Sequence, residues 1–337
     1  MSVTVLLSIA PPDGTTKYVD QLSEGKCDET RYKYFSWSTA LFGRYQVFHV
    51  HWPEYLIRAR NPRVGFVKRI LFRLLLARLD MSNIAVVRTL HNLHPHESGD
   101  LHERRLTKRL EARTDLNIRL NGATPVGADD VTILHGHFIG RFPSVTPRQS
   151  EAGRILYFGL IRPYKGVERL MHVFQAIEDS SLSLRIVGNP KPELRPLVED
   201  ACATDCRITA RLEYVPDDVL VSEIYRAELV VLPYKEMHNS GAILLALSLS
   251  RPVLAIRSAA NELLAAEVGA GWLMLYDGDL TEGVLRWAMR QVRTENRSSA
   301  PQLSGRDWDV VGTQHHAAYL KALHKRSVLR RQERPIT

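Results

Sequence analysis

The sequence predicts an α/β protein made of two doubly wound domains, each with a parallel sheet covered by helices. Three observations support this fold class. Short apolar segments alternate with segments of helical periodicity along most of the 337 residues. The length is sufficient for two domains of about 150 residues each. A polar stretch with two prolines, residues 140–150, separates two such alternating halves.

The strand candidates indicate two sheets, because each half supplies a series of them with helical segments between. The first half contains Thr4–Ile9, Val47–His51, Ile84–Thr89 and Asp130–Leu134, and Asn117–Leu120 adds a short one. The second half contains Arg154–Phe158, Leu184–Val187, Ile208–Arg211, Leu229–Leu232 and Pro252–Ile256. Strands that alternate with helices require crossover connections, so both sheets are expected to be parallel.

The polar stretch and the end of the chain set the expected domain boundaries. We expect an N-terminal domain over residues 1–147, a C-terminal domain over residues 148–305 and a last segment over residues 306–337. That segment contains a predicted helix, Val310–Leu323, and then a basic end, Lys325–Arg334, which we expect to fray.

Composition excludes several classes of protein. The hydrophobic fraction of 45% and the charged fraction of 24% are those of a soluble globular chain, and no run of 18 apolar residues is present to span a membrane. The first residues, Met1–Ser8, lack the basic region of a signal peptide. Cys27, Cys202 and Cys206 cannot all pair, and their spacing is not that of a zinc site. We therefore expect a cytoplasmic protein.

Positive charge is concentrated in the first half of the chain. Residues 1–150 carry 21 Lys and Arg against 14 Asp and Glu, whereas the rest carries 24 against 23. Part of the excess lies in a predicted basic amphipathic helix over residues 61–79, with Arg69 and Arg73 on one face. The apolar residues of another face are Phe66, Ile70 and Leu74. Such a helix either packs on the sheet or docks on anionic lipid. Nucleic acid is not an expected partner, because no recognition motif and no interleaving of basic and aromatic residues is present.

A candidate anion site follows the first strand of the second half. The apolar residues Ile155–Phe158 lead into a turn at Gly159, and Arg162 and Lys165 precede the start of an amphipathic helix. Two cations and a helix N-terminus directed at one place suit a diphosphate. The alternative is an ordinary basic loop between a strand and a helix.

A second candidate anion site lies about 75 residues further along. A buried strand ends at Pro233, and after a polar loop Ser240, Gly241 and Ala242 begin a strongly apolar helix. Residues of this kind start helices and leave backbone N–H groups free for an anion. If the strands Arg154–Phe158 and Leu229–Leu232 are neighbours, both candidate anion sites bind the same ligand.

Four segments in order carry a family resemblance: FGLIRPYKG, LRIVGNP, YVPDDVLVSEIYRAELVVLPY and SGAILLALSLSRPVLA. They resemble the donor domain of GT-B glycosyltransferases. The order of the segments is similar to that in the retaining family 4 enzymes, and their residues are more similar to those of bacterial exopolysaccharide β-mannosyltransferases of the xanthan type. The similarity covers residues 151–275 well and the N-terminal half loosely. It implies two Rossmann-like domains facing a central cleft, with the acceptor on the first domain, the nucleotide-sugar donor on the second, and the last helix crossing back to the first.

The resemblance also implies an activity, the transfer of a hexose, mannose being favoured, to a lipid-linked or growing glycan. Without a metal clamp, stabilisation of the leaving diphosphate falls to Arg162, Lys165 and the backbone of residues 240–242. The donor is expected to be GDP-mannose rather than a UDP-sugar, and the enzyme to be peripheral on the inner face of the membrane. No cofactor is expected.

Further donor contacts are expected around the same strand ends. Asn189 and Val215 flank the expected position of the nucleotide base, and Gly159 allows the backbone to approach the ligand. Glu262 either caps a helix or touches the ribose, and His137 contacts the sugar or the diphosphate.

One departure from family 4 favours inversion of the anomeric centre. Leu245 stands where retaining enzymes carry the second of two acidic residues, and Met237 lies near the position of the first. An inverting enzyme needs a base for the acceptor hydroxyl. Glu97 and His91 are the first candidates for that base, with His51 and Glu54 behind them.

The histidines supplying these candidates lie at three strand ends of the first half, in the segments 49–51, 91–96 and 135–137. The second segment, which also holds Glu97, is dense in residues that can ligate a metal. The spacing belongs to a loop and not to the helical pair of a zinc peptidase, so no metal is expected.

Two other functions remain open at this point. A nucleotide-sugar 2-epimerase of the same fold would also hold a diphosphate, and a catalytically inactive sugar-nucleotide-binding partner of a polysaccharide assembly complex would lack the acidic pair. A dinucleotide dehydrogenase is not expected, because no G-x-G-x-x-G follows the first strand.

Overall fold

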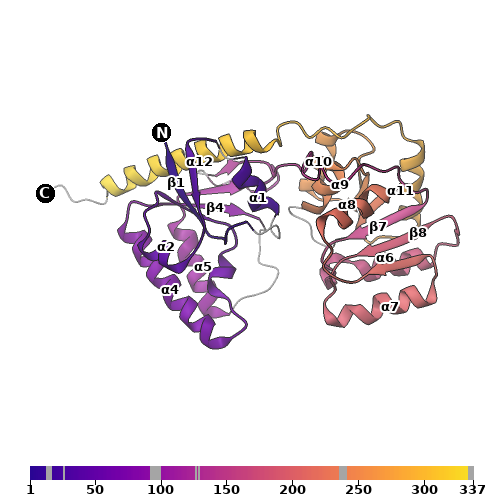
Figure 1. The fold of residues 1–337 in the computed structure, drawn as a ribbon, viewed down its shortest axis with the longest axis horizontal. Coiled ribbons are helices and arrows are strands. Elements are labelled where there is room, and N and C mark those ends of the chain that lie inside the picture. The colour runs from indigo at the N-terminus through magenta and orange to yellow at the C-terminus, as the bar shows by residue number, and fades with distance from the viewer. Residues whose placement is uncertain are drawn as a thin grey trace. The chain divides into compact units, whose positions relative to one another are not determined.

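Two parallel sheets of six strands organise the chain, each in its own compact unit (Figure 1). The computed structural model describes residues 1–12, 17–25, 27–91, 100–125, 127, 130–234 and 241–332. The first unit comprises Met1–Gly136 and Gly305–Thr337, and the second comprises His137–Ser304. The predicted fold class of two doubly wound α/β domains is confirmed.

The first unit has the strand order β2-β1-β3-β4-β5-β6, with every pair parallel. Its strands are β1 (Val3–Leu7), β2 (Thr30–Lys33), β3 (Val47–Val50), β4 (Ala85–Leu90), β5 (Leu116–Arg119) and β6 (Val131–Thr132). Its helices include α1 (Lys17–Glu24), α2 (Trp37–Phe42), α3 (Pro53–Ile57), α4 (Pro62–Met81) and α5 (Leu101–Arg113). The five strand candidates of this half are present, whereas β2 was not predicted because its sequence, Thr-Arg-Tyr-Lys, is polar.

The second unit has the strand order β12-β11-β10-β7-β8-β9, again parallel throughout. Its strands are β7 (Arg154–Phe158), β8 (Ser183–Val187), β9 (Ile208–Arg211), β10 (Leu229–Leu232), β11 (Val253–Ile256) and β12 (Leu273–Tyr276). Its helices include α6 (Val167–Gln175), α7 (Arg195–Thr204), α8 (Asp217–Arg226), α9 (Gly241–Ser248), α10 (Ala259–Val268) and α11 (Glu282–Thr294), with short 3-10 turns η1 (Pro163–Lys165) and η2 (Pro192–Leu194). Only the edge strand β12 was not predicted.

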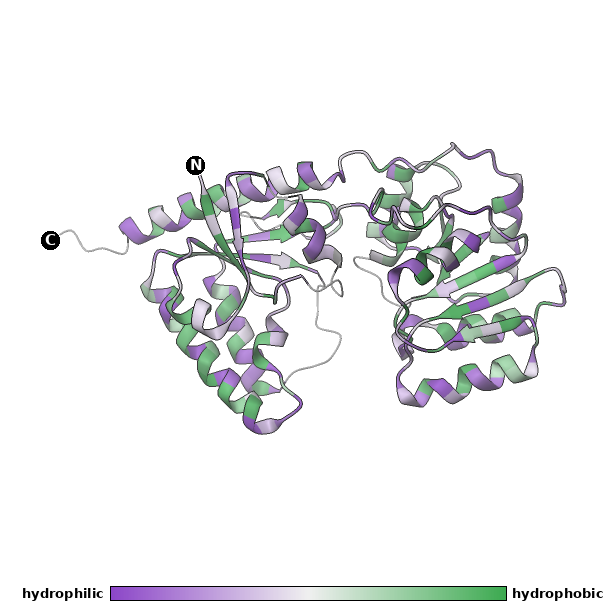
Figure 2. Ribbon diagram, in the orientation of Figure 1, coloured by the Kyte–Doolittle hydropathy of each residue, from purple (hydrophilic) through white to green (hydrophobic). Residues whose placement is uncertain are grey.

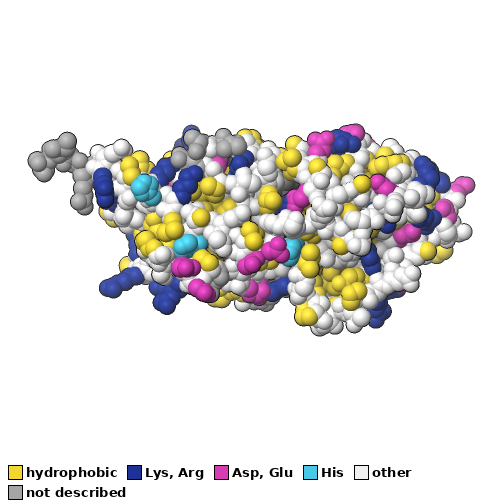
Figure 3. All heavy atoms as spheres, turned by 90° about the horizontal axis from the view of Figure 1, so that it is seen from above, with side chains coloured by type: hydrophobic (Ala, Val, Ile, Leu, Met, Phe, Trp, Pro, Cys, Tyr) yellow, Lys and Arg dark blue, Asp and Glu magenta, His cyan; other side chains and the backbone are white. Residues whose placement is uncertain are grey.

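Apolar strands and one-sided helices account for the two cores. Figure 2 shows that the strands of both sheets are largely hydrophobic, whereas many helices carry hydrophilic residues on one side. The last helix, α12 (Trp308–Gln332), packs on the first sheet, where Val311 and Tyr319 are fully buried beside Val47 and Val87. The face seen in Figure 3 mixes basic, acidic and apolar side chains.

Two details of the expected boundaries differ from the structure. The second unit begins at His137, earlier than residue 148, because Phe138 is buried in its core. The basic end that was expected to fray is helical as far as Gln332. Lys325 donates to the carbonyl of Asp115 at 2.9 Å, which anchors this part of α12 to the sheet. No helix in the described part of the chain is both long and apolar enough to cross a bilayer.

Each sheet contains one place where the direction of strand addition reverses. In the first sheet this switch point lies between β1 and β3, and in the second between β7 and β10. Doubly wound domains bind their ligands in the crevice beyond the carboxyl ends of the strands at such a point. Ligands are therefore expected at the loops after β1, β3, β7 and β10.

Candidate functional site

The loop after β7 contains two glycines whose conformations the turn requires. Gly159 has φ +111° and Gly166 has φ +67°, both in the range that side chains disfavour. A Cβ on Gly166 would lie 2.3 Å from the carbonyl oxygen of Pro233, at the end of β10. The loop is thus pressed against the neighbouring strand end, which brings the two predicted anion devices onto adjacent strands. The expectation that these strands are neighbours is confirmed by the pairing of Val230 with Leu156.

Lys165 is held at this strand end by an aromatic side chain. Its Nζ donates to the hydroxyl of Tyr234 at 3.2 Å and lies 4.5 Å from the centre of the same ring. Burial, and secondarily the charge of Arg162, lowers the pKa of Lys165 to about 8. Among the described residues neither cation has a carboxylate within ion-pair distance. An anion bound here would stabilise both of them.

Arg162 joins the β7 loop to the loop after β8. Its guanidinium donates to the carbonyls of Ile161 at 2.7 Å and Asn189 at 3.0 Å. Gly188, just before Asn189, lies so close to the carbonyl of Gly159 that a Cβ would come within 1.8 Å of that oxygen. The structure therefore brings Gly159, Arg162, Lys165 and Asn189 together at one end of the sheet.

The start of α9 completes this side of the site. The helix begins at Gly241, followed by Ala242. Ser240, Met237 and the rest of residues 235–240 lie outside the described part of the chain. Gly241 and Ala242 therefore remain candidates for backbone contacts to an anion.

The other predicted donor residues have their own local surroundings. Val215 is 9% exposed and follows β9. Glu262 is exposed on α10 and pairs with Arg257 at 3.1 Å, so a structural role is visible for it. His137 accepts from the backbone N–H of Ile139 at 3.3 Å. The adjacent Phe138 N–H donates to Ser248 at the end of α9 opposite to Gly241, so this part of the chain runs past the far end of that helix.

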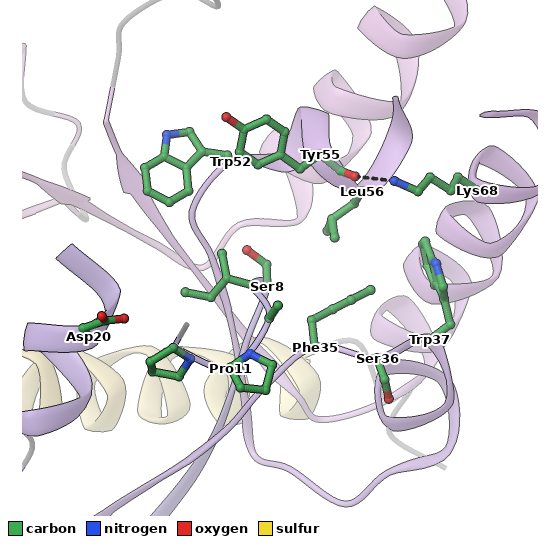
Figure 4. Close-up of a pocket in the computed structure, with 13 residues that line it drawn as sticks. Ser8, Pro11, Asp20, Phe35, Ser36, Trp37, Trp52, Tyr55, Leu56 and Lys68 are labelled. Carbon is green, nitrogen blue, oxygen red and sulfur yellow. Dashed lines mark hydrogen bonds between the residues drawn. The ribbon is translucent and has the colours of Figure 1, made fainter. Parts of the chain in front are cut away.

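The first unit has a pocket of about 560 Å³ at its own switch point (Figure 4). Its lining comes from the loops after β1, β2 and β3 and from α1, α2, α3 and α4. The residues that matter for its chemistry are Ser8, Asp20, Phe35, Trp52, Tyr55 and Lys68. Lys68 donates to the backbone carbonyls of Tyr55 and Arg58, each at 2.9 Å, which fixes α4 against α3.

The predicted histidine clusters converge beside this pocket in a buried network. His51 Nδ1 lies 3.0 Å from His91 Nε2, and the ring of His91 stacks on Trp52 with 4.1 Å between the ring centres. His49 is fully buried and contacts the hydroxyls of Thr89 and Tyr319 at 2.8 and 2.9 Å. Clustering of the histidines at neighbouring strand ends was thus predictable, but their burial was not.

Burial determines the protonation state of these histidines. It lowers the pKa of His51 to about 3 and lowers the pKa of His91 well below its usual value. Both are therefore weak bases at neutral pH, which is a disadvantage for a group that must accept a proton from a hydroxyl. Glu54 lies in the first turn of α3, whereas Glu97 falls outside the described residues. No group of three metal-ligating side chains within the described ranges has the geometry to hold a metal ion.

Sequence reasoning missed two groups in these sites. Tyr234 lies 69 residues from Lys165 in the chain, and no local pattern connects them. Asp20 and the aromatic residues around its pocket come from separate strand ends, so only the strand order brings them together. Tyr234 had one available signal, its position two residues after the strand candidate Leu229–Leu232, whereas Asp20 had none.

Comparison with known proteins gives a consistent result. The family model of the glycosyl transferases group 1 matches residues 152–288. A GDP-mannose:glycolipid 4-beta-D-mannosyltransferase of Xanthomonas campestris pv. campestris is 48% identical over 326 residues, which are 96% of this chain and 93% of that protein.

Solved structures agree in fold at low sequence identity. Anabaena HepE in complex with UDP superposes with a TM-score of 0.61 at 12% identity, covering 98% of this chain and 99% of that one. Sucrose-phosphate synthase from Thermosynechococcus elongatus gives a TM-score of 0.59 at 13% identity, with the same coverage of 98% and 99%.

Proposed function

This chain belongs to the family of the Xanthomonas GDP-mannose:glycolipid 4-beta-D-mannosyltransferase and is a GT-B glycosyltransferase, and from that premise we propose that it transfers mannose from GDP-mannose to a hydroxyl of a glycolipid. The identity extends over nearly the whole of both chains, so it includes the acceptor unit as well as the donor unit. This is the observation that carries the proposal.

The donor would bind at the carboxyl ends of β7, β8 and β10. We assign the diphosphate to Arg162, Lys165 and the first backbone N–H groups of α9, and the base to the neighbourhood of Asn189 and Val215. The supporting contacts are the bonds of Arg162 to Asn189 and of Lys165 to Tyr234, which hold both cations at one place. Fixed cations in a partly dehydrated site stabilise the negative charge that develops on a leaving diphosphate.

The cations make metal chemistry unnecessary in this proposal. Cleavage of the anomeric C–O bond leaves its electron pair on the diphosphate oxygen, and Arg162 and Lys165 neutralise that charge. The pKa of Lys165, about 8, adds a prediction for binding. GDP affinity should fall as the pH rises above 8, because the free lysine then loses the proton that attracts the diphosphate.

Thermal stabilisation by nucleotides tests the donor assignment. A one-site ligand at 100 times its Kd adds about 2.7 kcal/mol to the free energy of unfolding. We expect GDP and GDP-mannose to raise the melting temperature, and UDP, ADP and dTDP to raise it much less. Stabilisation by UDP alone would indicate a UDP-sugar as the donor instead of GDP-mannose. If no nucleotide raised the melting temperature, the alternative of a catalytically inactive partner protein would be favoured.

The apolar face of α4 supports a peripheral membrane location. Phe66 is 65% exposed and Leu74 is 52% exposed, and Ile70 lies between them at helical spacing. The opposite face of α4, including Phe72 and Leu76, is fully buried in the first unit. We propose that this exposed stripe enters the interfacial region of a bilayer that carries the glycolipid.

Arg69 has a different role from the one suggested by the sequence. It pairs with Asp100 at 2.6 Å, at the N-terminus of α5, whereas Arg73 remains exposed. A test should therefore change the stripe itself. The variant Phe66→Ser/Leu74→Ser should lose binding to vesicles containing anionic lipid by about 10- to 100-fold. A fully buried side chain of this kind carries about 1.5–3 kcal/mol of transfer free energy, and roughly half of that remains to be gained by each of these two half-exposed residues.

The control for that test is Leu197→Ser, an equally exposed apolar residue at 51% on α7 of the other unit. If Phe66→Ser/Leu74→Ser and the wild type bound vesicles equally, α4 would be only a surface helix packed on the first unit, with no role in membrane binding.

A further inference from the structure

The pocket of the first unit occupies the position at which its fold binds ligands. The switch point lies between β1 and β3, and the pocket is bounded by Ser8 after β1 and Trp52 after β3. Its volume of about 560 Å³ lies within the range of small-molecule sites. The donor residues considered above belong to the other unit, so this pocket has no occupant assigned so far.

The lining has the composition of a carbohydrate site. In Figure 4 the rings of Trp52 and Tyr55 lie along one side of the pocket and Phe35 lies on another, with Ser8 between them. Aromatic faces offer apolar contact to the C–H faces of a pyranose, and a few placed polar groups orient its hydroxyls. The helix α4, which closes the pocket with Lys68, also exposes the apolar stripe on its other side.

Asp20 supplies the acidic group of this pocket. It lies on α1, is 4% exposed, and is part of the lining. In Figure 4 its carboxylate oxygens face the side of the pocket formed by the loop after β1. A carboxylate in this position accepts hydrogen bonds from sugar hydroxyls, and it can take a proton from one of them when the hydroxyl oxygen attacks.

We infer that this pocket binds the terminal hexopyranose of the glycolipid acceptor and that Asp20 is the general base. This inference rests on the proposed function, because it assigns the second substrate of that reaction. The acceptor hydroxyl gives its proton to the Asp20 carboxylate as its oxygen forms a bond to the anomeric carbon of the donor. The bond from that carbon to the diphosphate breaks, and its electron pair leaves on GDP.

The geometry favours Asp20 over the histidines as the base. His51 donates its backbone N–H to Ser8 at 2.9 Å, but its side chain bonds to His91 beneath Trp52. His51 is 2% exposed and is not part of the pocket lining. The histidines therefore support the aromatic wall, whereas Asp20 borders the space that a sugar would occupy.

Two variants separate the base from the binding surface. Asp20→Asn should lower mannosyl transfer at least 100-fold, remove the acid limb of the pH–rate profile and leave stabilisation by GDP unchanged. Tyr55→Ala should raise the acceptor KM about tenfold with a smaller effect on kcat, and Tyr55→Phe should restore it. Tyr55 is 66% exposed, so its removal should not threaten the fold. The matched control is Glu24→Gln, an exposed carboxylate on the same helix.

A binding measurement tests the sugar pocket independently of the proposed donor, GDP-mannose. Octyl β-D-glucopyranoside below its micellar concentration should change the tryptophan fluorescence of the wild type saturably, and this change should be weaker in Tyr55→Ala. If the wild type binds the glucoside saturably but transfers no mannose, the sugar-binding role of the pocket is supported and GDP-mannose is excluded as the donor. Active wild type with full transfer in Asp20→Asn, or with an unchanged acceptor KM in Tyr55→Ala, would overturn the inference.

Discussion

Mild acid should selectively destabilise the first unit, because that unit buries neutral histidines. His49, His51, His135 and His315 are each 9% exposed or less. Burial lowers the pKa of His51 to about 3 and those of His135 and His315 to about 4, and the pKa of His49 lies well below its usual value. Unfolding exposes all four to water, where a histidine has a pKa of about 6.5.

The sign and the size follow from this difference in proton binding. Between the folded and unfolded pKa values the unfolded chain binds more protons, so stability is complete above pH 6.5 and is lost as the pH falls below it. From pH 7 to pH 5.5 each such histidine removes about 1.3 kcal/mol from the free energy of unfolding. These four remove about 5 kcal/mol, a large part of the 5–15 kcal/mol that is typical of a domain, and His91, whose pKa burial also lowers, adds to the loss.

Hydrogen exchange read by mass spectrometry can follow the two units of the intact chain separately. After correction for the intrinsic exchange rate, peptides from β3 and β4 should lose about 5 kcal/mol of protection between pH 7 and pH 5.5. Peptides from β7 and β8 serve as the reference, because every described histidine that is 9% exposed or less lies in the first unit.

One substitution isolates a single contribution. In His315 the Nδ1–H donates to the carbonyl of Val311 at 2.7 Å, and the variant His315→Gln removes the titrating group from this position. The pH-dependent loss should then shrink by about 1.3 kcal/mol, whereas His172→Asn, an exposed position on α6, should leave it unchanged. A similar loss in both units, or a loss below about 1 kcal/mol in the first, would refute the reasoning.

Three further predictions concern the donor unit. Arg162→Ala or Lys165→Ala should lower kcat/KM by about 100- to 1000-fold without loss of the fold, with the exposed Arg290→Ala on α11 as control; near-normal rates would exclude the diphosphate role. Gly166→Ala should lower the free energy of unfolding by about 2–4 kcal/mol in urea denaturation, because the added Cβ meets the Pro233 carbonyl. Gly278 has nearly the same φ but no atom within 4 Å of an added Cβ, so Gly278→Ala should lower it by only about 1–2 kcal/mol. Equal losses in the two variants would show that the contact with Pro233 is unimportant. Transfer should persist in EDTA, and an enzyme that EDTA inactivates and a divalent cation restores would require a metal in the mechanism.

Much of the donor unit could be predicted from the sequence because its signals are local. The strands β7, β9 and β10 have the predicted bounds, and β7 and β10 are short, largely apolar runs. The edge strand β2 is polar and gave no such signal, whereas β12 is apolar and follows a glycine turn, so its signal was present. The glycines of the anion loop could be recognised from the sequence. Why glycine is needed there, namely the close approach to Pro233 and to the β8 loop, is visible only in the structure.

The acceptor unit was less predictable because its site depends on strand order. Histidines at three strand ends indicated a site, and the structure places His51 and His91 beside the pocket. Whether those histidines faced the ligand or the core could not be decided from spacing. Asp20 had no motif around it, and its relation to Trp52 and Tyr55 follows only from the position of β1 between β2 and β3.

The most direct test of the central claim is transfer from radiolabelled GDP-mannose into the glycolipid fraction of membranes from the producing cells. We expect label in an acid-labile, organic-soluble product together with release of GDP, and no label from UDP-glucose. Nuclear magnetic resonance of the product should show a β-linked mannose. Conversion of GDP-mannose to a free epimer, or binding of GDP-mannose without any lipid product, would contradict the account and favour the epimerase or the inactive partner.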